Sequence, residues 1–389
     1  MHDPFPYPPP ALLAQWTTPL ADALSLATLP LHIHELLLAA LGYHLICRYL
    51  SPYLSSKLFP RIYPALNART KLNWDVHVVS LAQSLLINTL ALWVFWADEE
   101  RGRMGWEARV WGYTGAGGMI QGFAAGYFLW DLSVCAGNVG VFGWGLLAHA
   151  VAALVVFSLG FVSISPTVLR RPFVNFYGPT FILYELSSPF LNFHWFFDKL
   201  HMTGSRPQWY NGMFLLSSFF CCRLVWGTYQ SIRVSQDVWA ALHYDPLTMT
   251  SKAVFEPDAG SVDIMRFAGD YPMPAWLAIV YMSSNLVLNT LNFYWFGKMI
   301  ETIRKRFAES KDKKGGRKRE DKEEGVMVEG LMDSSTLMTE IADDEDMQFG
   351  GEDIMYDEEV EDKLGMESSF LDGKSTIEVK KTEVRRRKG

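Results

Sequence analysis

The stretch FVNFYGPTFILYELSSPFLNFHWFF, residues 173–197, decides the fold class of this sequence. Glu185 is the only carboxylate in it, and it contains no lysine or arginine. Crossing the hydrocarbon layer of a bilayer takes about 20 predominantly apolar residues in a helix. A run of this length in lipid must be helical, because a helix satisfies its own backbone polar groups. We therefore expect a transmembrane helix here.

Six further apolar runs have the same character. They lie at about 31–50, 76–97, 109–134, 140–162, 211–231 and 275–298. Long apolar runs separated by short polar loops indicate an all-α, polytopic transmembrane helix bundle of about seven spans.

The charge distribution separates this body from a tail. Residues 301–389 carry 18 Lys+Arg and 25 Asp+Glu, whereas the first 300 residues carry 17 of each. The tail has few large apolar residues, so we expect a disordered, charged extension. Its basic start, KDKKGGRKRE at 311–320, could contact anionic lipid head groups. A solvated linker is the simpler interpretation of the same residues.

Basic residues in short loops predict the orientation. Arg48, Lys57, Arg61, Arg69 and Lys71 accompany the first loop, and Lys298, Arg304, Lys305 and Arg306 follow the last span. With seven spans both segments face the same side, so the positive-inside rule predicts a cytosolic C-terminus. Arg170 and Arg171 fall on the opposite side. The start, MHDPFPYPPP, lacks a basic region, which favours an uncleaved first helix over a cleaved signal peptide.

Polar side chains form stripes inside the apolar runs. Glu185, Ser188 and Asn192 share one helical face, and so do Asn285 and Asn289. Pro189 lies within the first of these runs and predicts a kink. A further stripe comprises His77, Ser80, Ser84 and Asn88. Amide and hydroxyl stripes of this kind can simply hydrogen-bond neighbouring helices.

The ionisable groups favour a second interpretation. Asp131, His149, Glu185 and Arg223 lie in apolar runs, where charges mark cavities for polar ligands. We expect these side chains to converge on a chamber for a lipid head group. The expected lipid-binding residues are Asp131, His149, Glu185, Ser188, Asn192, Arg223, Asn285 and Asn289.

Several kinds of site are not indicated. Cys47, Cys135, Cys221 and Cys222 lie in apolar runs without the spacing of a zinc site or a disulfide framework. The sequence shows no nucleotide-binding loop and no metal cluster, and its one basic run is in the tail. We expect no cofactor, no metal and no nucleic-acid partner.

The block RPFVNFYGPTFILYELSSPFLNFHWFFDKL, 171–200, resembles the TLC (TRAM/Lag/CLN homology) domain, as do WDVHVVS at 74–80, GYFLWD at 126–131 and FFCCRLVWGTYQS at 219–231. It is more similar to fungal and animal TLC-domain proteins of unassigned activity than to ceramide synthases. The resemblance implies an N-terminal segment with the first helix at 1–67, a TLC domain of six spans at 68–303, and a tail at 304–389. The segment at 162–170 interrupts the resemblance as an insertion.

The resemblance also implies a place in lipid homeostasis in the endoplasmic reticulum, by binding or sensing a membrane lipid. Ceramide synthases of this superfamily carry two adjacent histidines followed by aspartates. Here His149 is followed by Ala150, so the pair is halved. A general base must lie within reach of the substrate proton. The alternatives are an acyl-CoA-dependent acyltransferase, with His149 as base and Asp131 orienting it, or a lipid carrier.

Overall fold

The computed structural model describes residues 1–24, 26, 28–161, 173–243, 264–265 and 273–316, with side chains of the last helix as far as residue 304. The elements in these ranges are helical and include no strand. In chain order they are α1 (Ala11–Ala23), α2 (Leu29–Leu45), η1 (Ile46–Leu50), α3 (Ser51–Leu58), η2 (Tyr63–Ala65), α4 (Ala68–Ala97), α5 (Glu99–Gly102), α6 (Trp106–Trp111), α7 (Gly115–Gly137), α8 (Val139–Leu159), α9 (Tyr177–Phe181), η3 (Ile182–Ser187), α10 (Ser188–Lys199), α11 (Arg206–Phe219), η4 (Phe220–Trp226), α12 (Gly227–Leu242) and α13 (Ala275–Gly316).

Three of the described helical stretches are long and apolar enough to cross a membrane. They are Leu29–Leu58, which joins α2, η1 and α3, then α4 and α8. These match the expected spans at 31–50, 76–97 and 140–162. The other four expected spans contain helices, but these helices are too short or too polar to be counted with the three. The all-helical membrane protein is thus supported, and the number of seven spans stays a prediction.

The third expected span, 109–134, is divided in the structure. Arg109 belongs to the short helix α6, and α7 begins only at Gly115. Thr114 precedes α7 and caps it, since its side chain accepts a hydrogen bond from the Gly117 backbone N–H. Such a cap satisfies one of the unpaired N–H groups of the first turn, which fixes where the helix starts.

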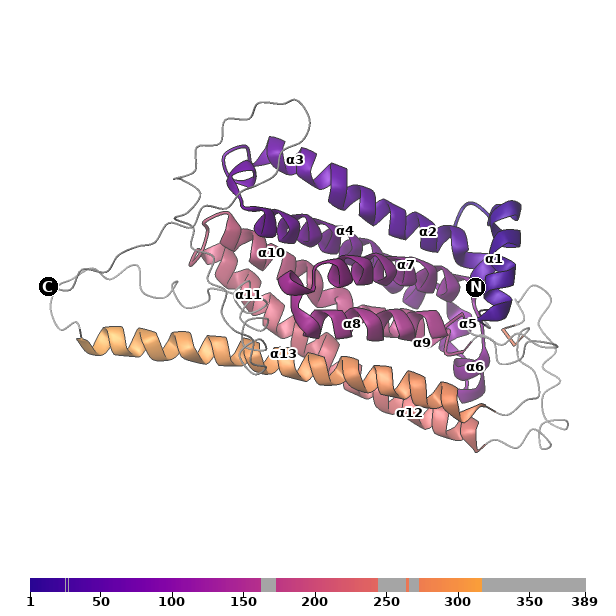
Figure 1. Ribbon diagram of the computed structural model, residues 1–389. Coiled ribbons are helices and arrows are strands. Elements are labelled where there is room, and N and C mark those ends of the chain that lie inside the picture. Colours follow the sequence, from indigo (N-terminus) through magenta and orange to yellow (C-terminus); the bar gives the residue numbers. More distant parts are fainter. Residues whose placement is uncertain (25, 27, 162–172, 244–263, 266–272, 317–389) are drawn as a thin grey trace, which may run out of the picture. The chain divides into compact units, whose positions relative to one another are not determined.

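Glycines of α7 bring this helix close to α2, its neighbour in Figure 1. Gly118, Gly122 and Gly126 recur every four residues, so they share one face. A Cβ atom at Gly126 would lie 2.3 Å from the Leu36 backbone oxygen of α2. Small residues at this spacing allow two membrane helices to approach backbone to backbone.

The apolar stretch at 173–197 is not one continuous helix. It is divided into α9, the 3₁₀ segment η3 and α10. Pro189 was expected to kink a helix here, but it lies in the first turn of α10. A proline is tolerated at that place because the missing N–H would have had no intrahelical partner. Glu185 therefore lies on a tight 3₁₀ turn and not on a regular helical face with Asn192.

The helix from Arg206 to Leu242 contains a π-helical insert, η4, between α11 and α12. Arg223 lies within this insert and is 7 % exposed. A π-helical turn adds a residue to the local repeat and changes the direction of the side chains around it. Here it turns the guanidinium of Arg223 toward η3.

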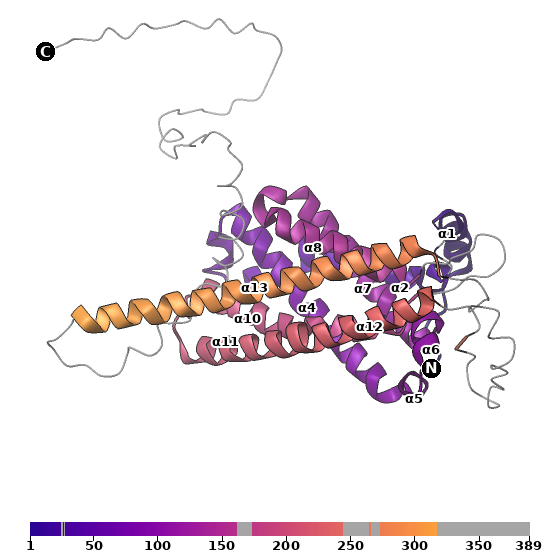
Figure 2. The same cartoon turned by 90° about the horizontal axis from the view of Figure 1, so that it is seen from below.

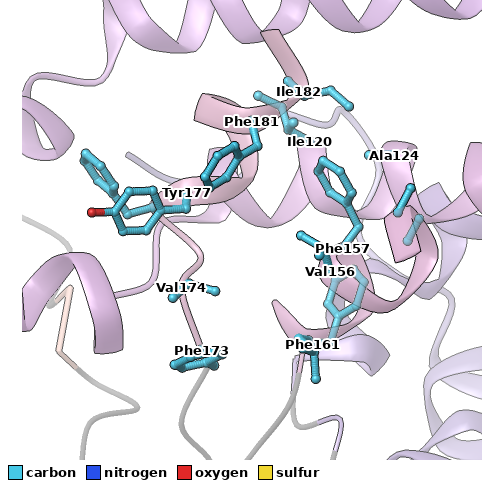
Figure 3. Packing of buried hydrophobic residues seen from close by; sticks show 14 of the residues in the cluster. Ile120, Ala124, Val156, Phe157, Phe161, Phe173, Val174, Tyr177, Phe181 and Ile182 are labelled. Carbon is cyan, nitrogen blue, oxygen red and sulfur yellow. The ribbon is translucent and has the colours of Figure 1, made fainter. Parts of the chain in front are cut away.

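The main apolar cluster extends from α2 and α4 to α12 and α13, and Figure 3 shows the part of it between α7, α8 and the α9–η3 segment. Ile120 and Ala124 of α7 face Phe157 of α8 and Ile182 of η3 in this view. Ile120 and Ala124 are fully buried, and Phe157 is stacked on Phe128 with ring centroids 5.2 Å apart. This packing holds η3, with its single carboxylate, against two long helices.

The last helix, α13, lies beside α12 and packs against α8, as Figures 1 and 2 both show. It continues to Gly316, past residue 304, where the tail was expected to begin. The tail from 317 on, the segment 162–170 and the residues Arg170 and Arg171 lie outside the described residues. The expectations placed on them stay predictions.

Candidate functional site: a buried ion pair and the groove between α12 and α13

A buried arginine–glutamate pair lies at the centre of the TLC-like region. Nη2 of Arg223 is 3.6 Å from Oε1 of Glu185, and both side chains are about nine-tenths buried. The Ser188 hydroxyl donates to Oε2 of Glu185 over 2.6 Å and accepts from Arg223 at 3.1 Å. Asn88 of α4 also donates to the Glu185 backbone oxygen. The two opposite charges therefore lie in a hydrogen-bonded setting, which a buried pair requires.

Further acceptors complete the surroundings of the arginine. Nε of Arg223 donates to the Tyr184 carbonyl and to the Ser187 hydroxyl, and Nη1 donates to Oδ1 of Asn292 on α13. The guanidinium thus links η3, η4 and α13. Because Glu185 balances its charge, the cluster is electrically neutral and does not demand an anionic ligand.

An enclosed cavity of about 30 Å³ borders this pair. Glu185, Arg223, His149 and Asn285 line it together with apolar side chains of α7, α8 and α13. Four of the eight expected site residues therefore lie around one cavity, and their role in binding stays a prediction. A volume of this size has room for about one water molecule, so it cannot admit a lipid head group in this conformation.

His149 enters the cavity from α8 without a described hydrogen bond at one ring nitrogen. Its Nδ1 is buried and makes no hydrogen bond within the part of the chain that the structure describes. The ring instead contacts aromatic neighbours, with its centroid 5.3 Å from that of Trp295 and 6.4 Å from that of Phe128. Asp131 therefore does not hold Nδ1, as the acyltransferase alternative would require.

Asp131 is not among the residues that line the enclosed cavity. Its Oδ1 accepts a long contact from the thiol of Cys135, at 3.8 Å, one turn along α7. The expected grouping of Asp131 with His149 as direct partners is thus not found.

Asn192 joins a different cluster. Nδ1 of His77 donates to its Oδ1 over 2.7 Å, and its Nδ2 donates to the Ser80 hydroxyl over 3.0 Å. His77 is also stacked on Trp195, with centroids 4.3 Å apart. Both ends of the Asn192 amide are therefore used to attach α10 to α4, which is the interhelical role that the polar stripes allowed.

A wide groove of about 570 Å³ runs between α12 and α13. Asn285 and Asn289 lie in its wall, where Nδ2 of Asn289 donates to Oδ1 of Asn285 and to the Ser231 hydroxyl, each over 2.9 Å. Apolar side chains form most of the rest: Ile232, Trp239, Met282, Leu286 and Phe293. Asn285 borders both this groove and the cavity beside the ion pair.

The sequence did not reveal two polar clusters that matter here. The Arg109 guanidinium forms a two-bond ion pair with Asp237 of α12 at 2.6 and 2.7 Å, and the Tyr177 hydroxyl donates to the same carboxylate. At the start of α2, Nδ1 of His32 donates to Oε2 of Glu35 over 2.7 Å. The spacing of His32 and Glu35 on one helical face was the available signal, since a carboxylate in an apolar run is costly.

The second cluster also bears on metal binding, which the sequence did not predict. Ligand atoms of Asp3, His32 and Glu35 lie within 4.8 Å of one another, and the described residues contain no other such group of three. Asp3 comes from a distant part of the sequence, so the pattern is visible only after folding.

The chain was compared with known protein families and proteins. The model of the TLC domain family matches residues 73–301. A TLC domain-containing protein of Schizosaccharomyces pombe is 34 % identical over 297 residues, which cover 76 % of this chain and 87 % of the relative. The Saccharomyces cerevisiae protein named topoisomerase I damage affected protein 4 is 26 % identical, over 70 % of this chain and 85 % of its own.

An animal relative matches a smaller part. Human TLC domain-containing protein 4 is 28 % identical over 47 % of this chain and 65 % of its own length. No solved structure matches. The match across 73–301 contains the Arg223–Glu185 pair, His149 and both groove asparagines, and the resemblance inferred from the sequence is confirmed. This chain belongs to the TLC domain family.

Proposed function

We propose that the chain binds a membrane lipid in the groove between α12 and α13 and acts in lipid homeostasis. The observation that carries this proposal is the position of Asn285, which borders both the open groove and the enclosed cavity behind it. A volume of about 570 Å³ is within the range of small-molecule sites. The enclosed cavity then serves as the polar backing of the site and not as the head-group chamber expected from the sequence.

The groove offers separate surroundings for the two parts of a lipid. Ser231, Asn285 and Asn289 provide hydroxyl and amide groups for a polar head, and the aromatic and aliphatic wall suits an acyl chain. In hydrocarbon, polar side chains that face a groove gain by bonding to a ligand, because water is absent there. The neutral Arg223–Glu185 pair supports recognition through hydrogen bonds and does not select for net charge.

The expected setting is an endoplasmic reticulum membrane with a cytosolic C-terminus. The positive-inside distribution of lysine and arginine supports this orientation, and the resemblance implies the compartment. A tag accessibility assay with tags at either end tests the orientation. The basic start of the tail, from 311 to 320, remains a candidate contact for anionic head groups.

A groove-filling variant tests lipid binding. Ser235 lies in the groove wall, where its hydroxyl contacts the Met282 sulfur at 3.9 Å. We expect Ser235→Trp to occupy the space of an acyl chain and to lower the amount of co-purified lipid at least tenfold. The lipids retained by the purified full chain are identified and counted by mass spectrometry.

The matched control places the same indole on another lipid-facing helix. Val151 of α8 is 45 % exposed and does not line the groove. Val151→Trp is expected to keep the wild-type lipid content. Equal lipid profiles for wild type and both variants would contradict binding in the groove. A lipidome comparison of cells with and without the protein then tests the role in homeostasis.

A further inference from the structure

The start of α2 carries a buried histidine–carboxylate cluster outside the segment that matches the TLC domain. His32 and Glu35 are both 0 % exposed, although this helix belongs to a stretch apolar enough to span a membrane. Nδ1 of His32 is 2.7 Å from Oε2 of Glu35 and 3.5 Å from Oδ2 of Asp3. One imidazole nitrogen therefore faces two carboxylates from separate segments.

Helix α7 has glycines where this cluster needs space. A Cβ atom at Gly118 would lie 2.2 Å from Nε2 of His32, and one at Gly122 would lie 2.8 Å from Oε2 of Glu35. Any larger residue at either place would collide with the cluster. The cluster is thus fitted into the α2–α7 interface, and the polar groups are held in a fixed position.

The opposite side of the imidazole is also anchored. The hydroxyl of Tyr113, immediately before the start of α7, is hydrogen-bonded to Nε2 of His32. A histidine that binds a metal through one nitrogen usually donates its other N–H to such a neighbour, which fixes the ring orientation. Here this contact leaves Nδ1 directed at Asp3 and Glu35.

Two carboxyl groups share a single imidazole nitrogen in this cluster. No lysine or arginine forms an ion pair with Glu35 or Asp3 in the part of the chain that the structure describes. Oε1 of Glu35 is buried, lies 4.0 Å from Nε2 of His34 and makes no hydrogen bond with the described residues. A buried carboxyl group with an unused oxygen is costly, so a bound cation would stabilise it.

The segment that carries Asp3 is held in place by its own contacts. A Cβ atom at Gly115 would lie 2.2 Å from the Asp3 backbone nitrogen, so the two backbones touch. The Phe5 ring packs on His34 and Phe123, with centroids 5.1 and 5.9 Å away. Asp3 itself is about one-third exposed, which gives an ion a path from water.

We propose that Asp3, His32 and Glu35 bind one divalent transition-metal ion of the zinc class, which attaches the N-terminal segment to α2. Two ligand atoms at about 2.1 Å from a tetrahedral zinc ion lie about 3.4 Å apart, close to the 3.5 Å between His32 and Asp3. The shorter contact between His32 and Glu35 opens as the ion replaces the shared proton. Nitrogen and carboxylate oxygen donors suit zinc, manganese or iron. The site is independent of the lipid groove.

The experiment measures metal in the purified full chain without a histidine tag. Wild type, Asp3→Asn and His44→Ala are treated with a chelator, incubated with Zn²⁺ and desalted, and zinc is counted by mass spectrometry. His44 is an exposed histidine of the same helix and controls for unspecific binding by imidazole. We expect about one zinc in wild type and in His44→Ala. In Asp3→Asn we expect the affinity for Zn²⁺ to fall at least tenfold, so that little zinc remains after desalting. Loss of a residue that supports a zinc ligand typically lowers metal affinity about 10- to 100-fold.

Asp3→Asn is chosen because it changes one exposed oxygen and keeps the size of the side chain, so the fold should survive. Co²⁺ in place of Zn²⁺ provides a second readout, since visible absorption of a four-coordinate complex requires bound ligands. Absence of stoichiometric zinc in the wild type would overturn the proposal. Unchanged zinc affinity in Asp3→Asn, or its loss in His44→Ala, would also overturn it, because the ion would then lie elsewhere.

Discussion

Asn192 and His149 are both polar side chains inside apolar helices of the TLC region, yet their surroundings differ. Both ends of the Asn192 amide are hydrogen-bonded to α4, to His77 and Ser80. His149 has a buried Nδ1 without a partner and borders a cavity next to the Arg223–Glu185 pair. The difference separates a polar group that joins two helices from one that makes no such link. The hydrogen bonds of Asn192 stabilise the contact between α10 and α4, whereas the His149 ring contributes through its packing on Trp295 and Phe128.

The largest effect is expected where a charge is left unpaired. Arg223→Met would leave Glu185 buried without its cation, and we expect a loss of about 3–5 kcal/mol in the free energy of unfolding. SDS-induced unfolding of the purified protein measures it. The double variant Arg223→Met/Glu185→Gln should recover a large part of the loss, because contacting residues are not additive. Equal stability of Arg223→Met and wild type would show that the pair does not form.

An intermediate effect is expected at the bonded amide. Asn192→Leu removes both hydrogen bonds and leaves His77 and Ser80 without them, so we expect a loss of about 1–3 kcal/mol. The same unfolding assay applies, and lipid co-purification should stay at the wild-type level. A loss of bound lipid at unchanged stability would instead place Asn192 in the site.

The smallest effect is expected at the unbonded ring. His149→Phe keeps the contacts with Trp295 and Phe128 and removes a nitrogen that has no partner, so stability should change by less than about 1 kcal/mol. Comparison with Asn192→Leu in one assay sharpens the contrast between the two regions. A penalty as large as that of Asn192→Leu would mean that His149 has a structural partner in the membrane.

A second comparison, between a glycine in the α2–α7 interface and one outside it, tests the packing of the N-terminal half. Gly118→Ala would place a methyl group 2.2 Å from Nε2 of His32, and overpacking of this kind typically costs about 1–3 kcal/mol. Gly140, which meets nothing within 4 Å, is the matched control, and Gly140→Ala should be close to neutral. Equal stabilities of the two variants would contradict the close approach of α2 and α7. Zinc binding should fall in Gly118→Ala alone.

The order of polar residues along the chain could be read from the sequence, but their partners could not. The sequence placed Glu185, Ser188 and Asn192 on one stripe because a regular helix puts them there. The 3₁₀ turn η3 before α10 breaks that register, so Glu185 and Ser188 face Arg223 while Asn192 faces α4. Propensity and periodicity do not reveal a change of helix type, since tertiary packing selects it.

The sequence by itself determined the helical membrane body, the charged tail and the family, because hydrocarbon admits few backbone structures and long apolar runs are visible in one dimension. Only the tertiary structure decided which ionisable groups meet. Arg223 reaches Glu185 through a π-helical turn, and Asp3 reaches His32 where glycines of α7 leave room. Such contacts join residues far apart in the chain, and they depend on the direction of individual side chains, which apolar patterning does not encode.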